Sequence, residues 1–120
     1  MNESAEALLN VSSSGVAFGK EPHLIIITGS ITARPGSLEE LEAISLAHVE
    51  RSRLEPGCLS HGVHRDVENP LRLVFFERWL DQPSVDAHFA VASSGEFVRQ
   101  AMALSDSPPT LELFDVVARE

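Results

Sequence analysis

Residues 71–79 alternate in a way that indicates a β-strand with two apolar faces. The stretch is rich in leucine, valine, phenylalanine and tryptophan, and Asn69-Pro70 stands before it. Successive side chains of a strand point to opposite sides, which places Leu73, Phe75, Glu77 and Trp79 on one face and Val74, Phe76 and Arg78 on the other. Both faces therefore need cover from water. Glu77 is unusual in such a strand because burying an unpaired carboxylate is costly.

Residues 81–92 follow with the pattern of an amphipathic helix. Val85, His88, Phe89 and Ala92 recur at the spacing i, i+3, i+4 and i+7, so they share one face. A histidine thus occupies a position where a hydrophobic residue is the ordinary choice. Residues 93–95, with the sequence SSG, are predicted to interrupt this helix, and a further turn or two is expected over 96–104.

The rest of the chain predicts three more strands, over 24–33, 58–66 and 110–118, and one more helix, over 38–54. Ser37 and Glu40 have the spacing of a capping box at the start of that helix. Its inward stripe is expected to contain Leu38, Leu41, Ile44 and His48. The order strand, helix, strand, strand, helix, strand is the ferredoxin-like split β-α-β arrangement, an α+β fold in which both helices cover one face of a four-stranded antiparallel sheet.

The second face of that sheet is also apolar. Val74 and Phe76 on one strand, with Phe114 and Val116 on the last strand, lie opposite the side that the helices cover. A bare apolar patch of this size would be adhesive. The simplest cover is the same sheet of a second copy, so the pattern predicts a two-fold homodimer packed sheet to sheet.

The composition of the chain restricts the kinds of molecule that it is expected to bind. The chain has 120 residues, 43% of them hydrophobic, and a formal net charge of −9, with no basic patch interleaved with aromatics. We therefore expect a single core and neither nucleic-acid nor membrane binding. The lone Cys58 and the absence of a basic-then-apolar leader favour a cytoplasmic location. Residues 1–22 are small, polar and acidic and predict a flexible arm before a folded domain over 23–120.

Three motifs carry a family resemblance: EPGCLSHGVHRD at 55–66, FFERW at 75–79 and DAH at 86–88. Together they resemble the antibiotic biosynthesis monooxygenase domain, a dimeric α/β-barrel group that includes small quinol monooxygenases. The resemblance extends over about residues 24–118. It implies the same ferredoxin-like fold and, for the oxygenating members, direct reaction of a deprotonated small aromatic quinol with dioxygen, without metal, flavin or haem.

The resemblance also suggests roles for particular residues. His88 would be the catalytic base, Glu77 would orient it or bind a substrate hydroxyl, and Trp79 would stack on the substrate ring. The predicted substrate-binding residues are His61, His64, Phe75, Phe89 and Phe97. At most one of His61 and His64 can face the pocket, because residues three apart on a strand point to opposite sides. Structural roles stay open: Trp79 as packing, His88 as a bonded core residue, and Glu77 as partner of Arg99 or Arg65.

At several positions the chain differs from particular groups within this family, and these differences indicate which reactions are disfavoured. The positions that match the asparagine and histidine of haem-degrading members are Gly29 and Ala101, which disfavours haem degradation. Phe75 and Val85 replace the asparagine and tyrosine of the polyketide-tailoring oxygenases. The set Glu77, Trp79 and His88 fits quinol oxidation and also resembles isomerases of phosphorylated signalling sugars, which are the alternative. A dimeric ligand-binding domain without turnover is the third reading.

No metal site is expected from spacing. His61 and His64 project from opposite faces of one strand, and the sequence has no His-x-x-x-His pair on a helix. We therefore predict no metal and no other cofactor.

Overall fold

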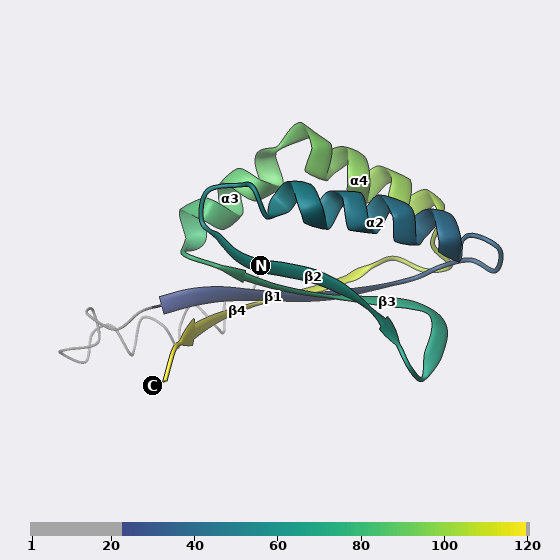
Figure 1. The fold of residues 1–120 in the computed structure, drawn as a ribbon, viewed down its shortest axis with the longest axis horizontal. Coiled ribbons are helices and arrows are strands. Elements are labelled where there is room, and N and C mark those ends of the chain that lie inside the picture. Colours follow the sequence, from purple (N-terminus) through teal and green to yellow (C-terminus); the bar gives the residue numbers. More distant parts are fainter. Residues whose placement is uncertain (1–22, 120) are drawn as a thin grey trace.

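The computed structural model describes residues 23–119, which form an antiparallel sheet with helices on one side (Figure 1). The predicted flexible arm, residues 1–22, lies outside the described residues. The strands are β1 (His23–Thr32), β2 (Cys58–Asp66), β3 (Asn69–Trp79) and β4 (Thr110–Val117). The helices are α2 (Leu38–Ser52), α3 (Gln82–Ala90) and α4 (Ala92–Ala103).

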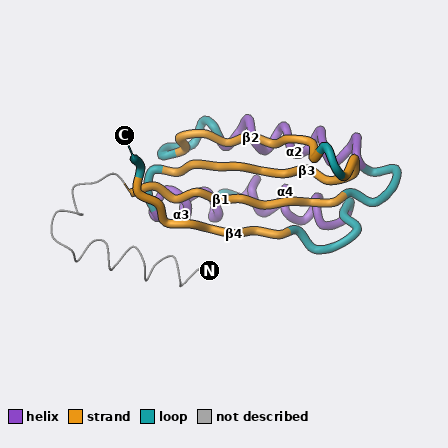
Figure 2. Tube along the Cα trace, turned by 90° about the horizontal axis from the view of Figure 1, so that it is seen from below, coloured by secondary structure: helices purple, strands orange, loops and turns teal. Residues whose placement is uncertain are grey.

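The sheet order is β2-β3-β1-β4, and every neighbouring pair is antiparallel. Figure 2 shows α2 behind the β2–β3 half of the sheet, and α3 and α4 behind the β1–β4 half. This is the ferredoxin-like α+β fold that the order of elements predicts. The two central strands, β1 and β3, are not consecutive in the chain, so each half of the fold contributes one of them.

The alternation in β3 sets the core. Leu73, Phe75, Glu77 and Trp79 are all buried, whereas Phe76 and Arg78 between them are exposed. One core cluster joins Leu73 and Phe75 to α2 and α4, and a second joins Trp79 to Val85 and to isoleucines of β1. The side chains that face the helices are therefore those assigned to that face from the sequence.

The helix ends depart from the sequence prediction. Ser37 makes no side-chain capping bond, because its backbone (φ −110°, ψ 0°) is near-helical rather than extended. Residues 93–95 do not interrupt the second helical stretch; they form the first turn of α4. The break lies instead at Val91 (φ −67°, ψ 131°), whose extended backbone separates α3 from α4.

The far face of the sheet is open to solvent in the single chain. Phe76 and Phe114 keep 43% and 37% of their surface exposed there. They lie on either side of the shared neighbour β1, where Phe76 pairs with Thr28 and Phe114 with Ile26. This apolar face is the one for which a partner sheet is predicted. No helix among residues 23–119 is long and apolar enough to cross a membrane.

Candidate functional site

A cavity of about 380 Å³ lies between the helices and the β1–β4 half of the sheet. Its walls are mainly apolar, with Phe75 from β3, Phe97 and Met102 from α4, and Leu111 from β4. One end is polar and carries His48, Glu77 and His88. The cavity thus has apolar walls along most of its length and ionisable side chains at one end, as sites for small aromatic molecules usually do.

His88 is fixed from behind by Glu55. Its Nδ1 lies 2.8 Å from Glu55 Oε1, and the imidazole is 3% exposed. A carboxylate can only accept, so Nδ1 carries the proton and the lone pair is on Nε2. Glu55 reaches this position because the turn after α2 rests on α3: Gly57 (φ +86°) has no Cβ, and one would lie 2.0 Å from Ser84 Oγ.

Glu77 is held by Trp79 rather than by His88. The indole Nε1 of Trp79 donates to Glu77 Oε1 at 2.8 Å, and both side chains are buried. The two residues are neighbours on the same face of β3, so the strand itself sets this pairing. The prediction that Glu77 orients His88 is therefore wrong in this structure, because Glu55 occupies that role.

Arg65 and Arg99 do not pair with Glu77 either. Arg65 bonds Glu42 and Arg99 bonds Glu96, both on the protein surface. Glu77 has no lysine or arginine partner within residues 23–119. His61 Nε2 lies 3.4 Å from Glu77 Oε1 without forming a hydrogen bond.

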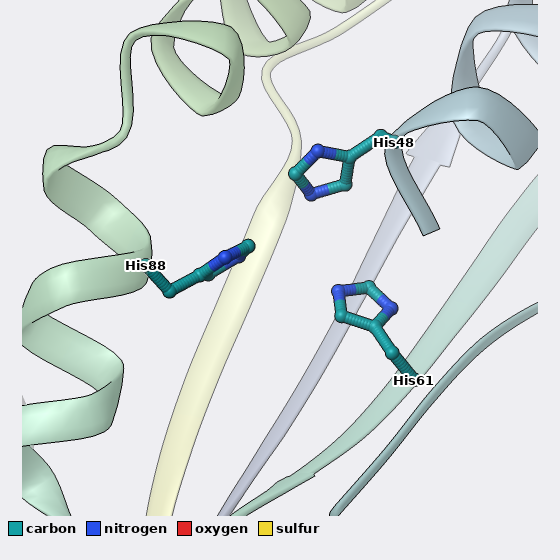
Figure 3. A group of neighbouring side chains, drawn as sticks. All are labelled: His48, His61 and His88. Carbon is teal, nitrogen blue, oxygen red and sulfur yellow. The ribbon is translucent and has the colours of Figure 1, made fainter. Parts of the chain in front are cut away.

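Three histidines from three elements meet beside Glu77. Figure 3 shows His48 of α2, His61 of β2 and His88 of α3 pointing toward one another. One ligating atom of each lies within 4.8 Å of those of the other two. His48 also stacks on Phe97, with ring centroids 4.2 Å apart. The prediction that His48 belongs to the inward stripe is confirmed, and the structure adds that this stripe ends in the histidine cluster.

Burial shifts the pKa values of these residues in the directions that favour their uncharged forms. Desolvation, helped by the neighbouring His88, lowers the pKa of His48 to about 4. Desolvation lowers that of His61 to about 3, and it raises the pKa of the Glu77 carboxyl to about 7 against the opposing effect of the Trp79 bond. The contact between His61 and Glu77 is therefore not a stable ion pair near neutral pH.

The other predicted site residues divide between the two sides of the sheet. Phe75 and Phe97 line the cavity, and so does Phe89, although 46% of its surface is exposed. His64 does not contribute to this cavity. It lies beside Gly62 on the opposite face of β2 and is exposed, as the strand alternation requires. His64 is therefore not part of this site.

Sequence reasoning missed two participants, Glu55 and His48. In the sequence analysis Glu55 enters only within the family motif, and His48 only as part of the inward stripe of the first helix. Their link to His88 depends on where the turn at Gly57 sits against α3, and on how α2 crosses the sheet. Neither feature leaves a spacing signal along the chain.

Gly29 also lines the cavity, and a Cβ there would lie 2.7 Å from the backbone oxygen of Thr110.

Residues 24–100 match the family model of antibiotic biosynthesis monooxygenases. In sequence, the chain is 32% identical over 92 residues to the uncharacterized protein sll1783 of Synechocystis. The match covers 77% of this chain and 63% of the relative, so the chain spans less than two thirds of that protein's length.

Solved structures of similar fold include three with TM-scores near 0.7. The structure of PA3566 from Pseudomonas aeruginosa has 27% identity and a TM-score of 0.68, covering 81% of this chain and 95% of its own. One described as an antibiotic biosynthesis monooxygenase has 26% identity and a TM-score of 0.73, covering 78% and 99%. Rv0793 from Mycobacterium tuberculosis, at 21% identity and a TM-score of 0.75 over 80% and 97%, is similar in fold.

Proposed function

Because the chain belongs to the antibiotic biosynthesis monooxygenase family, we propose that it oxygenates a small quinol or polyhydroxy-aromatic molecule with dioxygen. The observation that carries this proposal is the cavity of about 380 Å³ with apolar walls and one polar end. Its size is within the range of about 300–1,000 Å³ that small-molecule sites usually have. A single aromatic ring with one or two hydroxyl groups matches both its volume and its polarity.

The two ends of such a substrate would meet different side chains. The ring would lie against Phe75 and Phe97, which line the cavity and contact each other edge to face with ring centroids 6.0 Å apart. A hydroxyl would reach the polar end, where Nε2 of His88 is the proton acceptor and Glu77 a hydrogen-bond partner. Trp79 is fully buried beneath Glu77, so we assign it to holding that acid and not to stacking on the substrate.

The proposed reaction balances without an external reductant. A hydroquinone and dioxygen give a hydroxyquinone and water: one oxygen atom enters a ring C–H bond, and the other leaves as water. The substrate supplies all four electrons, two in hydroxylation of the ring and two in oxidation to the quinone. The protein's part is to remove the hydroxyl proton through His88 and to shelter the electron-rich ring from bulk water.

We further propose that the chain works as a homodimer in the cytoplasm. The open apolar face around Phe76 and Phe114 supports a sheet-to-sheet partner. A second copy on that face would leave the cavity, which lies on the helix side, accessible to substrate. The lone Cys58 supports the cytoplasmic location.

The alternative reaction, isomerisation of a phosphorylated sugar, is less well supported. Arginine and lysine are the side chains that usually bind phosphate, and none of the described residues that line the cavity is a lysine or an arginine. A chain with a net charge of −9 also repels such anions. A binding domain without turnover has the same cavity, and only an activity measurement separates it from an enzyme.

Oxygen uptake with a panel of hydroquinones tests the proposal. We expect uptake with at least one member, and His88→Ala should reduce the rate about 100-fold, the usual effect of losing a general base. His64→Ala is the matched control, because this histidine is exposed on the face of β2 that points away from the cavity, and its rate should be unchanged.

The other outcomes separate the readings. Product formation from a phosphorylated sugar without oxygen consumption would establish the isomerase. Tight binding of aromatics with no uptake under any condition would establish the binding domain. Equal losses in His88→Ala and His64→Ala would show that the cavity is not the site of reaction.

A further inference from the structure

The histidine cluster has the arrangement of a metal site. The ring centroids of His48 and His61 are 5.4 Å apart, those of His48 and His88 5.3 Å, and those of His61 and His88 5.8 Å. The three rings come from α2, β2 and α3, and all are buried. Nitrogens bound to one zinc ion at about 2.0–2.1 Å lie roughly 3.4 Å apart, so movements of about 1 Å per ring would bring these into place.

His61 is the strongest single indication of a ligand. It is 3% exposed, yet neither Nδ1 nor Nε2 makes a hydrogen bond. Leaving a buried polar group unsatisfied costs about 1–3 kcal/mol, and the large majority of such groups in folded proteins have partners. A bound cation would satisfy one of these nitrogens where no described residue does.

The neighbours of the cluster have the form of an outer coordination shell. Histidines that bind metals almost always donate their second nitrogen to a carboxylate or carbonyl, which fixes the ring and the tautomer. His88 does this with Glu55 at 2.8 Å. Glu77, the carboxyl group next to the cluster, is held in turn by a hydrogen bond from Trp79 Nε1 at 2.8 Å.

Glu77 lies beside these donors. It is a buried carboxyl group without a lysine or arginine partner among the described residues, and its Oε1 is 3.4 Å from His61 Nε2. A cation bound to the histidines would stabilise its ionised form. We propose that His48, His61 and His88 bind one divalent first-row transition metal ion, with the fourth position left to water, as in metal sites that have three protein ligands.

The donor set selects the class of ion. Imidazole nitrogens suit zinc, iron, nickel and copper, whereas magnesium and calcium prefer sites made only of oxygen. The sequence prediction of no metal site compared only neighbouring residues within single elements. The cluster histidines that are closest in sequence, His48 and His61, are 13 positions apart, so that comparison could not find them. The fold, not local spacing, assembles the ligands.

Metal binding to the full chain, freed of any affinity tag and treated with a chelator, tests the proposal. Titration with Zn²⁺ should show one equivalent per chain, and Co²⁺ should give the visible absorption of a four-coordinate site. His61→Ala and His88→Ala should each reduce the Zn²⁺ affinity by more than about 100-fold, a larger effect than the 10–100-fold typical of losing an outer-shell partner.

Two matched variants keep the test specific. His64→Ala removes a histidine from the other face of β2, and Cys58→Ser removes the free thiol; both should retain one equivalent and the Co²⁺ spectrum. Circular dichroism establishes that His61→Ala and His88→Ala are folded, and if one is not, the other serves. Binding that is weaker than about 0.1 mM, or that falls equally in His64→Ala, would overturn the proposed site.

This inference does not depend on the proposed reaction, because the readout is binding in the absence of substrate. Zinc binding without oxygen uptake by either the chelated or the metal-loaded protein would retain the metal site and reject the oxygenase. Oxygen uptake by chelated protein that binds no metal would retain the oxygenase and reject the metal site.

Discussion

The carboxylate of Glu55 accepts a hydrogen bond from Nδ1 of His88 across 2.8 Å. Glu55 lies in the turn after α2 and His88 lies in α3, so the bond joins these two helical elements at the polar end of the cavity. It leaves Nε2 of His88 with its lone pair, whether that nitrogen takes a proton from a substrate or binds a cation. Glu55 is a positioning residue in either case.

Removing this partner should weaken the site without unfolding the protein. We expect Glu55→Ala to lower both the oxygen-uptake rate and the Zn²⁺ affinity by about 10–100-fold. Glu55→Gln keeps an acceptor for Nδ1, so it should recover most of the loss if orientation is what matters. Glu50→Gln, on the exposed surface of α2, is the control. A purely structural role would lower the unfolding free energy of Glu55→Ala and leave the affinity unchanged.

The bond between Trp79 and Glu77 predicts a stability effect. Trp79→Phe keeps most of the buried ring but leaves Glu77 Oε1 without its indole donor. We expect the unfolding free energy to fall by about 1–3 kcal/mol in urea titrations. Adding Glu77→Gln to Trp79→Phe should restore part of this, because a buried amide costs less than a buried carboxylate. Leu80→Ala, at an exposed neighbour, should change stability by less than about 0.5 kcal/mol.

Asp81 caps α3, the helix that carries His88. Its side chain accepts from the backbone N–H of Ser84 at 2.9 Å, and its backbone is extended as a capping residue requires. Asp81→Ala should lower the unfolding free energy by about 1 kcal/mol near neutral pH.

The same residue predicts a pH dependence. Hydrogen bonds from Ser84 hold the pKa of Asp81 below its ordinary value of about 3.9. The stabilisation from this group is therefore fully present above that value and is lost as the pH falls through the lower pKa of the folded state. Asp81→Asn, which caps but does not titrate, should show a smaller loss between pH 5 and 3 in thermal unfolding. Identical profiles for the two proteins would contradict the assignment.

The proposed dimer interface can be tested with charges. Phe76→Asp and Phe114→Asp each place a carboxylate on the open face of the sheet, where a partner sheet would have to bury it. We expect each to shift the sedimentation of the chain from dimer to monomer. Val67→Asp, at a position that is 99% exposed in the β2–β3 turn, should leave the dimer intact. A wild-type chain that sediments as a monomer at micromolar concentration would reject the interface.

The sequence predicted the elements better than the site. Alternation in residues 71–79 identified both faces of β3, because a strand's period of two places each residue by its own number. The family motif led to His88, Glu77 and Trp79. It did not show which acid serves His88, because the motifs contain both Glu55 and Glu77 and only the position of the Gly57 turn decides between them. The histidine cluster was missed for the same reason: its members meet across three elements.

The close approach of β4 to Gly29 in β1 limits which side chains can be introduced at this position. A Cβ at that position would press on the carbonyl of Thr110, which belongs to the neighbouring strand and cannot rotate aside. Exchanging this residue for the asparagine that haem-degrading relatives are expected to need would force β4 away from β1. A combinatorial library that varies only the side chains around the cavity would therefore not produce haem degradation. A designer would first have to change the backbone so that β4 lies farther from β1.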